Sequence, residues 1–185
     1  MAVERRVPRA RVTLAPDGIE PPARRPNATL LKTVDLAPLR PEQADELVRM
    51  WRASFEHGVG VSDPHSLAQQ RRYLLTELLP NNAVRVAHSN GHLLGFVAAT
   101  RESITHLYVR VGHFGRGIGT TMLEWAKEQS DGSLWLYTYA RNTAARRFYE
   151  AHGFKAVAYG VEPVWQLEDV KYEWSRRPAP KARMA

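Results

Sequence analysis

The feature that most restricts the fold of this chain is a glycine-rich segment, Gly112–Gly119, which holds four glycines in eight residues. An apolar run, Ile104–Val111, precedes it and predicts a strand, and apolar residues at helical spacing follow it up to about Gln129. Glycine lets the backbone turn tightly and lets a ligand approach the main chain closely. Because a helix begins with unpaired N–H groups and the positive end of its dipole, this order of strand, turn and helix indicates an anion-binding site.

Two common phosphate-binding turns do not fit this segment. A P-loop needs a lysine before the Ser or Thr at the start of the helix, whereas here Gly119 is followed directly by Thr120. A dinucleotide fingerprint built on Gly115 and Gly117 needs a third glycine at the position of Thr120, and its acidic partner at the end of the next strand is missing as well. A purely structural role for the glycines, as a tight connection between a strand and a helix, stays the alternative to a ligand site.

The rest of the pattern predicts further helices and strands. Pro41 opens an apolar stripe at helical spacing that Gly58 should end, and Ser66–Leu79 predicts a second helix. Asn90-Gly91 predicts a hairpin turn, because both positions of such a turn need positive φ. The expected strands are Thr29–Val34, Ala83–Ser89, His92–Thr100, Ile104–Val111, Leu134–Ala140, Lys155–Tyr159 and Val170–Trp174, and the last two helices are Ile118–Gln129 and Thr143–His152.

This order of elements predicts an α/β (α+β) fold. We expect one mixed, mostly antiparallel central sheet of about seven strands, flanked by about four helices. The net charge of +7 lies in two ends, residues 1–27 and 175–185, which carry +3 and +4. We expect these ends to be disordered basic arms around a neutral folded domain, residues 28–174.

Composition excludes several classes of function. The neutral domain and the lack of a nucleic-acid motif argue against a nucleic-acid partner. With no cysteine in the chain, disulfides and thiolate metal sites are excluded. No apolar stretch is long enough to cross a membrane, and the N-terminus lacks the apolar core of a secretory signal. We therefore expect a cytoplasmic protein without a membrane partner.

Two motifs resemble the GNAT superfamily of N-acetyltransferases. Leu107–Val109 followed by Phe114–Gly119 resembles the acetyl-CoA-binding motif of that family, Gln/Arg-x-x-Gly-x-Gly/Ala after a Leu-x-Val strand, with Phe in the first motif position. Asn142–Phe154 resembles the family signature Asn-x-x-Ala-x-x-Phe-Tyr-Glu-x-x-Gly-Phe. The motifs stand in the order found in the family. The resemblance implies the GNAT fold, acetyl-CoA as co-substrate and no metal.

The resemblance also implies roles for individual residues. The pyrophosphate of the cofactor would lie on the main chain of Gly115–Thr120, and the pantetheine between two strands that splay apart, with an N–H near Val109 donating to the thioester oxygen. Tyr149 would be the general acid, since a phenol is protonated at neutral pH; its alternative is a core aromatic role. Asn142 is also a candidate helix N-cap. The residues assigned to the cofactor are Leu107, Tyr108, Val109, Val111, Phe114, Gly115, Arg116, Gly117, Ile118, Gly119, Thr120, Asn142 and Tyr149.

The sequence leaves the general base and the acceptor site open. Glu102 and His106 are the candidate bases, with a surface or structural role as the alternative for both. His106 should face the side of its strand opposite to Leu107 and Val109. The acceptor would be bound by the segments 56–65 and 160–169. The aromatic residues considered for an acceptor pocket are Trp51, Phe55 and Trp165, with the core of the first helix as the alternative for the first two.

These observations predict an N-acetyltransferase that moves an acetyl group from acetyl-CoA to a primary amine. The acceptor would be a small molecule or a peptide, and the protein a monomer or homodimer. The alternative is a non-catalytic acyl-CoA-binding or sensing module of the same fold. Phe114 favours that alternative, whereas Asn142 and Tyr149 oppose it.

Overall fold

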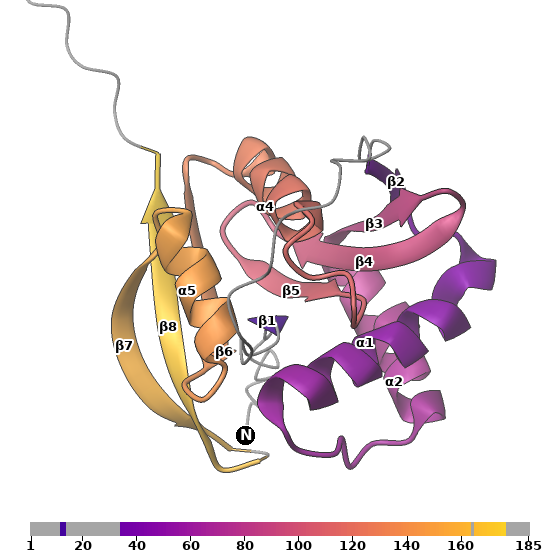
Figure 1. Ribbon diagram of the computed structural model, residues 1–185, viewed down its shortest axis with the longest axis horizontal. Helices are drawn as coiled ribbons and strands as arrows, with labels where there is room; N and C mark the ends of the chain where they lie inside the picture. The colour runs from indigo at the N-terminus through magenta and orange to yellow at the C-terminus, as the bar shows by residue number, and fades with distance from the viewer. Residues whose placement is uncertain (1–11, 14–33, 164, 177–185) are drawn as a thin grey trace, which may run out of the picture.

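The structure is a computed structural model that describes residues 12–13, 34–163 and 165–176 (Figure 1). Two sheets carry the strands, with the orders β1-β5-β4-β3-β2 and β6-β8-β7. The elements in chain order are β1 (Val12–Thr13), β2 (Asp35–Pro38), a 3-10 turn (Pro41–Gln43), α1 (Ala44–Val59), α2 (Leu67–Tyr73), a π-helical segment (Leu74–Leu78), α3 (Leu79–Asn81), β3 (Ala83–Ser89), β4 (His92–Ala99), β5 (Ile104–Val109), α4 (Ile118–Gln129), β6 (Ser133–Tyr139), α5 (Thr143–Ala151), β7 (Lys155–Glu162) and β8 (Leu167–Ser175).

The predicted fold class is confirmed, but the single expected sheet is divided into two. Several local signals also act as predicted. Asn90 and Gly91 join β3 to β4 with φ of 52° and 78°, as the hairpin turn requires. The hydroxyl of Ser66 caps α2 by accepting a bond from the N–H of Gln69. Short-range chemistry is therefore enough to place these boundaries.

Two predictions of element bounds are wrong, and the predicted first strand lies mostly outside the described residues. Gly58 lies inside α1, which ends instead at Gly60, a residue in the left-handed conformation. β7 extends to Glu162 and β8 begins at Leu167, so most of the predicted loop 160–169 is strand. The structure has a strand at Asp35–Pro38, whereas residues 29–33 of the predicted first strand lie outside the described residues.

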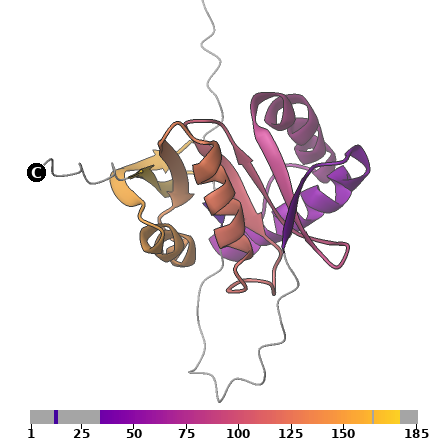
Figure 2. The same cartoon turned by 90° about the horizontal axis from the view of Figure 1, so that it is seen from above.

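Helices cover both faces of the first sheet (Figure 2). Side chains alternate along a strand, so β4 and β5 feed two separate cores. One core packs against α4 and includes Val97, Leu107 and Val109. The other packs against α1 and the α2 region and includes Phe96, Ala98 and Tyr108. The strand β5 is therefore buried on both faces, and its remaining contacts are made through its main-chain edges.

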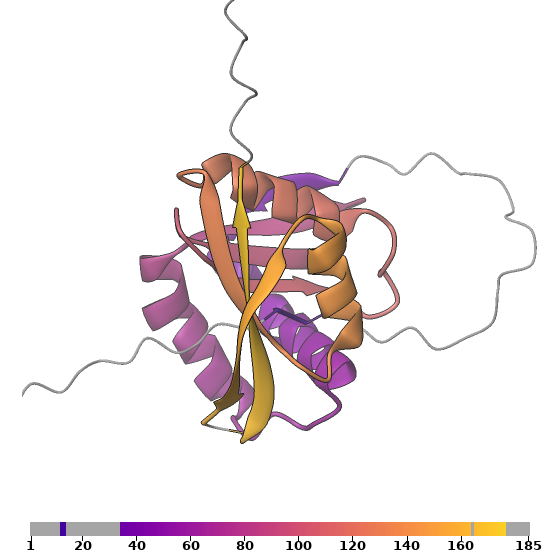
Figure 3. The same cartoon turned by 90° about the vertical axis from the view of Figure 1, so that its left-hand side faces the viewer.

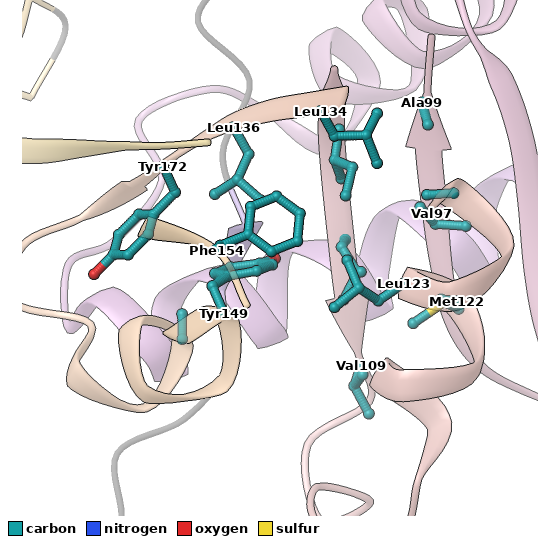
Figure 4. Packing of buried hydrophobic residues seen from close by; sticks show 14 of the residues in the cluster. Val97, Ala99, Val109, Met122, Leu123, Leu134, Leu136, Tyr149, Phe154 and Tyr172 are labelled. Carbon is teal, nitrogen blue, oxygen red and sulfur yellow. The ribbon is translucent and has the colours of Figure 1, made fainter. Parts of the chain in front are cut away.

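The two sheets meet at one end and separate towards the other. Ser103, just before β5, forms a parallel bridge with Trp135 of β6, and the Trp135 N–H donates to the carbonyl of Glu102 at 3.0 Å. Within the described ranges no ladder continues this bridge, so the facing edges of β5 and β6 diverge. The second sheet carries α5 against it (Figure 3). Apolar side chains from both sheets, α4 and α5 fill the interior between them (Figure 4).

The edge of β5 that faces the second sheet is paired with β1. Val12 lies opposite Leu107 and Thr13 opposite Tyr108, in parallel orientation. Figure 1 shows β1 among β5, β6 and α1. Apart from Val12–Thr13 and Ser175–Arg176, the two predicted arms lie outside the described residues. In the part of the chain that is described, no helix has the length and apolar content to cross a membrane.

Candidate active site

The connection between β5 and α4 exposes its main chain. Gly112, Gly115 and Gly117 have φ of 82°, 70° and 83°, a left-handed conformation that residues with a Cβ rarely adopt. A Cβ placed on any of the three would meet no heavy atom within 4 Å. The space in front of this backbone is therefore open to a ligand, which a side chain at these positions would keep away.

The first turn of α4 adds hydrogen-bond donors to this open backbone. Gly117 is the N-cap residue of the 12-residue helix and supplies no side-chain cap. The first intrahelical bond runs from the N–H of Thr121 to the carbonyl of Gly117 at 2.9 Å. The N–H groups of residues 118–120 precede that bond and point out of the helix end. Together with the helix dipole they form an anion site.

The other residues of the turn attach it to the fold. Gly119 differs from its neighbours, because a Cβ there would lie 3.3 Å from the ring of Phe148 in α5. Phe114 stacks on His57 at the end of α1, with ring centroids 5.8 Å apart and an interplanar angle of 8°. The hydroxyl of Thr120 lies 3.2 Å from Nε2 of His152. The Arg116 side chain is exposed.

The edge of β5 provides a second set of main-chain groups. The N–H of Arg110 donates to the carbonyl of Leu94 in β4 at 2.8 Å. Because N–H and C=O groups alternate between the two edges of a strand, those of Leu107 and Val109 point the other way, towards the second sheet. These are the groups that the sequence predicts will hold the pantetheine and the thioester oxygen. They lie on one edge, directly before the glycine turn.

Two buried polar atoms of α5 point into the same interior. Asn142 caps α5 by accepting a bond from the Ala145 N–H at 3.1 Å, yet its Nδ2 is buried without a hydrogen-bond partner among the described residues. The hydroxyl of Tyr149 is likewise buried, and no group in the described part of the chain is bonded to it. A spacing of seven residues places both on one face of the helix. Since buried polar atoms normally have partners, this pair suits a ligand that would satisfy them.

Tyr149 belongs to the apolar cluster that also contains Leu107 and Val109. Its ring packs on Phe154 at 5.5 Å between centroids (Figure 4). Burial, and in second place the nearby Tyr108, raise the pKa of Tyr149 well above its ordinary value. The hydroxyl therefore keeps its proton throughout the neutral range, as a proton donor must. The core position and the acid role are compatible.

Residues 80–156 match the family model of the acetyltransferase (GNAT) domain. They include the glycine turn, Asn142 and Tyr149. This part of the chain is similar to a GNAT acetyltransferase domain. A comparison with curated proteins finds no significant sequence match.

Solved structures share the fold of the GNAT domain. An acetyltransferase from Thermus thermophilus is 25% identical, with 77% of this chain and 97% of that chain covered at a TM-score of 0.63. The PaiA N-acetyltransferase of Thermoplasma acidophilum, in complex with coenzyme A, is 18% identical, with 77% and 99% covered and a TM-score of 0.62. YncA of Salmonella typhimurium, with its cofactor acetyl-CoA, is 16% identical, with 82% and 99% covered and a TM-score of 0.61.

The two roles of Asn142 in the GNAT domain can be separated by substitution. Asn142→Ser keeps a hydroxyl that caps the helix but removes Nδ2, so we expect normal stability and about fivefold weaker CoA binding, the effect of one lost hydrogen bond. Asn142→Ala should lose in addition about 1 kcal/mol of unfolding free energy. Calorimetric titration with CoA and urea unfolding measure the two effects. Equal CoA affinity in Asn142→Ser and the unsubstituted chain would leave Asn142 as a cap alone.

The structure separates the two candidate bases from the rest of the GNAT site. Glu102 is exposed and precedes β5. It lies seven residues before Val109, which along an extended strand is a distance of about 20 Å. His106 faces away from Leu107 and Val109, as predicted, and lies in an aromatic enclosure with Trp51 at 4.8 Å between ring centroids. Burial lowers the pKa of His106 to about 3. Its position and low basicity fit a structural residue better than a general base.

The burial of His106 predicts acid sensitivity. Its pKa is about 3 in the folded protein and about 6.5 in an unfolded chain. Between these values the unfolded chain binds a proton that the folded protein does not, so stability falls as the pH falls through this window. From pH 7 to pH 5 this residue alone should cost about 2 kcal/mol. Urea unfolding at both pH values measures it, and His106→Leu should show a decrease smaller by that amount; an equal decrease would contradict the assignment.

The two segments predicted to bind the acceptor lie together. Trp165, after the end of β7, packs on Phe55 of α1 at 5.2 Å between centroids and on His65 at 6.0 Å. The N–H of Trp165 donates to the carboxylate of Glu162 at 2.9 Å. Trp51 belongs instead to the core around His106 and Tyr108, which is the alternative given for it. Phe55 is buried in the same core, so the alternative holds for it as well, and Trp165 marks the end of the domain where the two predicted segments meet.

Sequence reasoning missed Gly95, which lies in β4 opposite Val109. A Cβ at Gly95 would come within 2.6 Å of the carbonyl oxygen of Tyr108. Only glycine lets β4 approach β5 this closely at the point where the β5 edge is needed. The signal was available, because a lone glycine inside an apolar strand often marks a close backbone approach.

Proposed function

We propose that this protein is an acetyl-CoA-dependent N-acetyltransferase that moves an acetyl group directly to the primary amine of a small-molecule or peptide acceptor. The observation that carries the proposal is the buried, unpartnered hydroxyl of Tyr149 in the cluster shared with Leu107 and Val109. A hydroxyl held there with a raised pKa suits proton donation to a leaving group at the β5 edge. The cysteine-free chain suits a reducing compartment, so we expect action in the cytoplasm, as a monomer or homodimer.

The residues present fit acetyl-CoA. The open backbone at Gly112, Gly115 and Gly117 and the first turn of α4 would hold the pyrophosphate. The edge of β5 at Leu107 and Val109 would bind the pantetheine amides. Nδ2 of Asn142 is a further unpaired donor for the same ligand. PaiA and YncA, which have this fold, were solved with CoA and acetyl-CoA, and this supports the assignment.

Acetyl-CoA supplies a thioester carbonyl that an amine can attack. The N–H of Val109 would donate to the carbonyl oxygen as negative charge develops there, in the manner of an oxyanion hole. The hydroxyl of Tyr149 would pass its proton to the departing sulfur, and the proton that the nitrogen loses as the amide forms would restore the hydroxyl. An alkylammonium must first lose a proton, because its pKa is about 10. With Glu102 distant and His106 weakly basic, we assign that proton to a solvent path at the acceptor end.

Release of the CoA thiol from acetyl-CoA tests the proposal. Because the chain contains no cysteine, a thiol-reactive dye reports the CoA product alone. We expect saturable CoA binding and thiol release that depends on the presence of an amine, tested over diamines, amino acids and peptides. A matched panel of N-acetylated compounds serves as the control. Saturable CoA binding without turnover on any amine would overturn the enzyme assignment and favour an acyl-CoA-sensing module.

A further inference from the structure

We propose that the β1 segment, Val12–Thr13, competes with the cofactor for the edge of β5, so that the chain carries its own inhibitor of CoA binding. The inference rests on the proposed function, since it takes the cofactor to be the competing ligand. It assigns a role to the N-terminal arm, which the catalytic site does not use.

The register of β1 carries the argument. Val12 pairs with Leu107 and Thr13 with Tyr108. This is the edge of β5 that turns towards the second sheet, and the proposed function assigns its main-chain groups to pantetheine and the thioester oxygen. A main-chain group that is already bonded within a ladder is not available to another strand-like ligand. β1 and pantetheine therefore cannot occupy this edge at the same time.

The position of β1 makes its presence on this edge favourable but reversible. β5 and β6 diverge after the Ser103–Trp135 bridge, so β5 would otherwise expose an unpaired edge. A strand of two residues contributes only a few bonds and is weak by itself. Residues 14–33 tether it to the domain, which keeps its effective concentration high. A ligand with many more contacts can then displace it.

This chain is longer than the fold it shares with two solved structures. The PaiA and YncA structures are covered over 99% of their lengths, yet they cover only 77% and 82% of this chain. About a fifth of the chain thus has no counterpart in them. In the proposed competition the fold binds the cofactor, and β1 reduces the fraction of molecules able to do so. An apparent dissociation constant rises in proportion as that fraction falls.

Calorimetric titration of CoA into the full-length chain tests the inference. The doubly substituted variant Val12→Pro/Thr13→Pro lacks the main-chain donor that faces β5, whichever of the two residues supplies it, and cannot complete the pairing. We expect this variant to bind CoA about tenfold more tightly. That change corresponds to β1 occupying the β5 edge in about nine of ten molecules of the unsubstituted chain. The matched control Val3→Pro/Thr29→Pro removes the same residue types outside the paired register, and we expect unchanged affinity.

Hydrogen exchange without ligand provides a second readout that is independent of CoA. Amides in residues 104–111 should exchange faster in Val12→Pro/Thr13→Pro than in the control. Unchanged exchange, or CoA affinity that is equal or weaker, would overturn the inference. If none of the three proteins bound CoA, the proposed function would fail, while faster exchange would still show that β1 protects β5.

Discussion

Replacing Tyr149 by phenylalanine should lower kcat for acetyl transfer about 100-fold and leave CoA affinity within about twofold. Removing a positioned proton donor typically costs between 10² and 10⁴ in rate. The ring, which packs on Phe154 and within the shared cluster, is kept. Because burial raises the pKa of Tyr149 well above its ordinary value, the loss should be the same at every pH from about 6 to 9. Steady-state thiol release and CoA titration measure the two quantities.

Tyr159→Phe is the matched control for this substitution. Tyr159 lies on β7 and is 71% exposed, so loss of its hydroxyl should leave kcat unchanged. Two results would count against the acid role of Tyr149. An unchanged kcat in Tyr149→Phe would remove it directly, and equal losses of kcat and CoA affinity would make Tyr149 a residue that shapes the binding site.

Gly117→Val should abolish detectable CoA binding, which corresponds to at least 100-fold weaker affinity. Gly117 has φ of 83°, and its missing Cβ faces open space at the N-terminus of α4. A valine would place methyl groups where the main chain must approach a phosphate. The left-handed backbone would also lower the stability of the valine variant by about 1–2 kcal/mol. Titration with CoA measures the affinity, and urea unfolding measures the stability.

Gly132→Val is the control that separates backbone strain from obstruction of the phosphate site. Gly132 has φ of 99° and equally open surroundings, but it lies in the turn before β6. The same residue change should therefore lower stability by a similar amount and leave CoA affinity intact. If Gly117→Val bound CoA as Gly132→Val does, the phosphates would have to be held elsewhere.

Sequence reasoning succeeded where the information lies within a few residues. The Asn90-Gly91 turn, the Asn142 cap and the start of α2 after Ser66 each depend on neighbouring main-chain groups. The side of β5 that His106 faces follows from strand alternation alone. Such features need no knowledge of distant contacts.

The features that sequence reasoning missed depend on distant pairings. The sheet is divided because, in the described residues, the β5 and β6 regions are joined only by the isolated bridge from Ser103 to Trp135. No local pattern in either strand encodes that division. The pairing of Val12 with Leu107 joins residues far apart in the chain. The position of the bases relative to Tyr149 is likewise set by the packing of whole elements.

The open glycine turn also bears on how such sequences diverge. A phosphate held by main-chain N–H groups constrains backbone torsions, and few side chains are needed to maintain them. Phe114 illustrates this freedom: it stands where the family motif has a polar residue and stacks on His57 instead. Substitutions can therefore accumulate around an unchanged backbone shape. This is consistent with a fold that matches known acetyltransferase structures at TM-scores above 0.6 with identities of 25% or less.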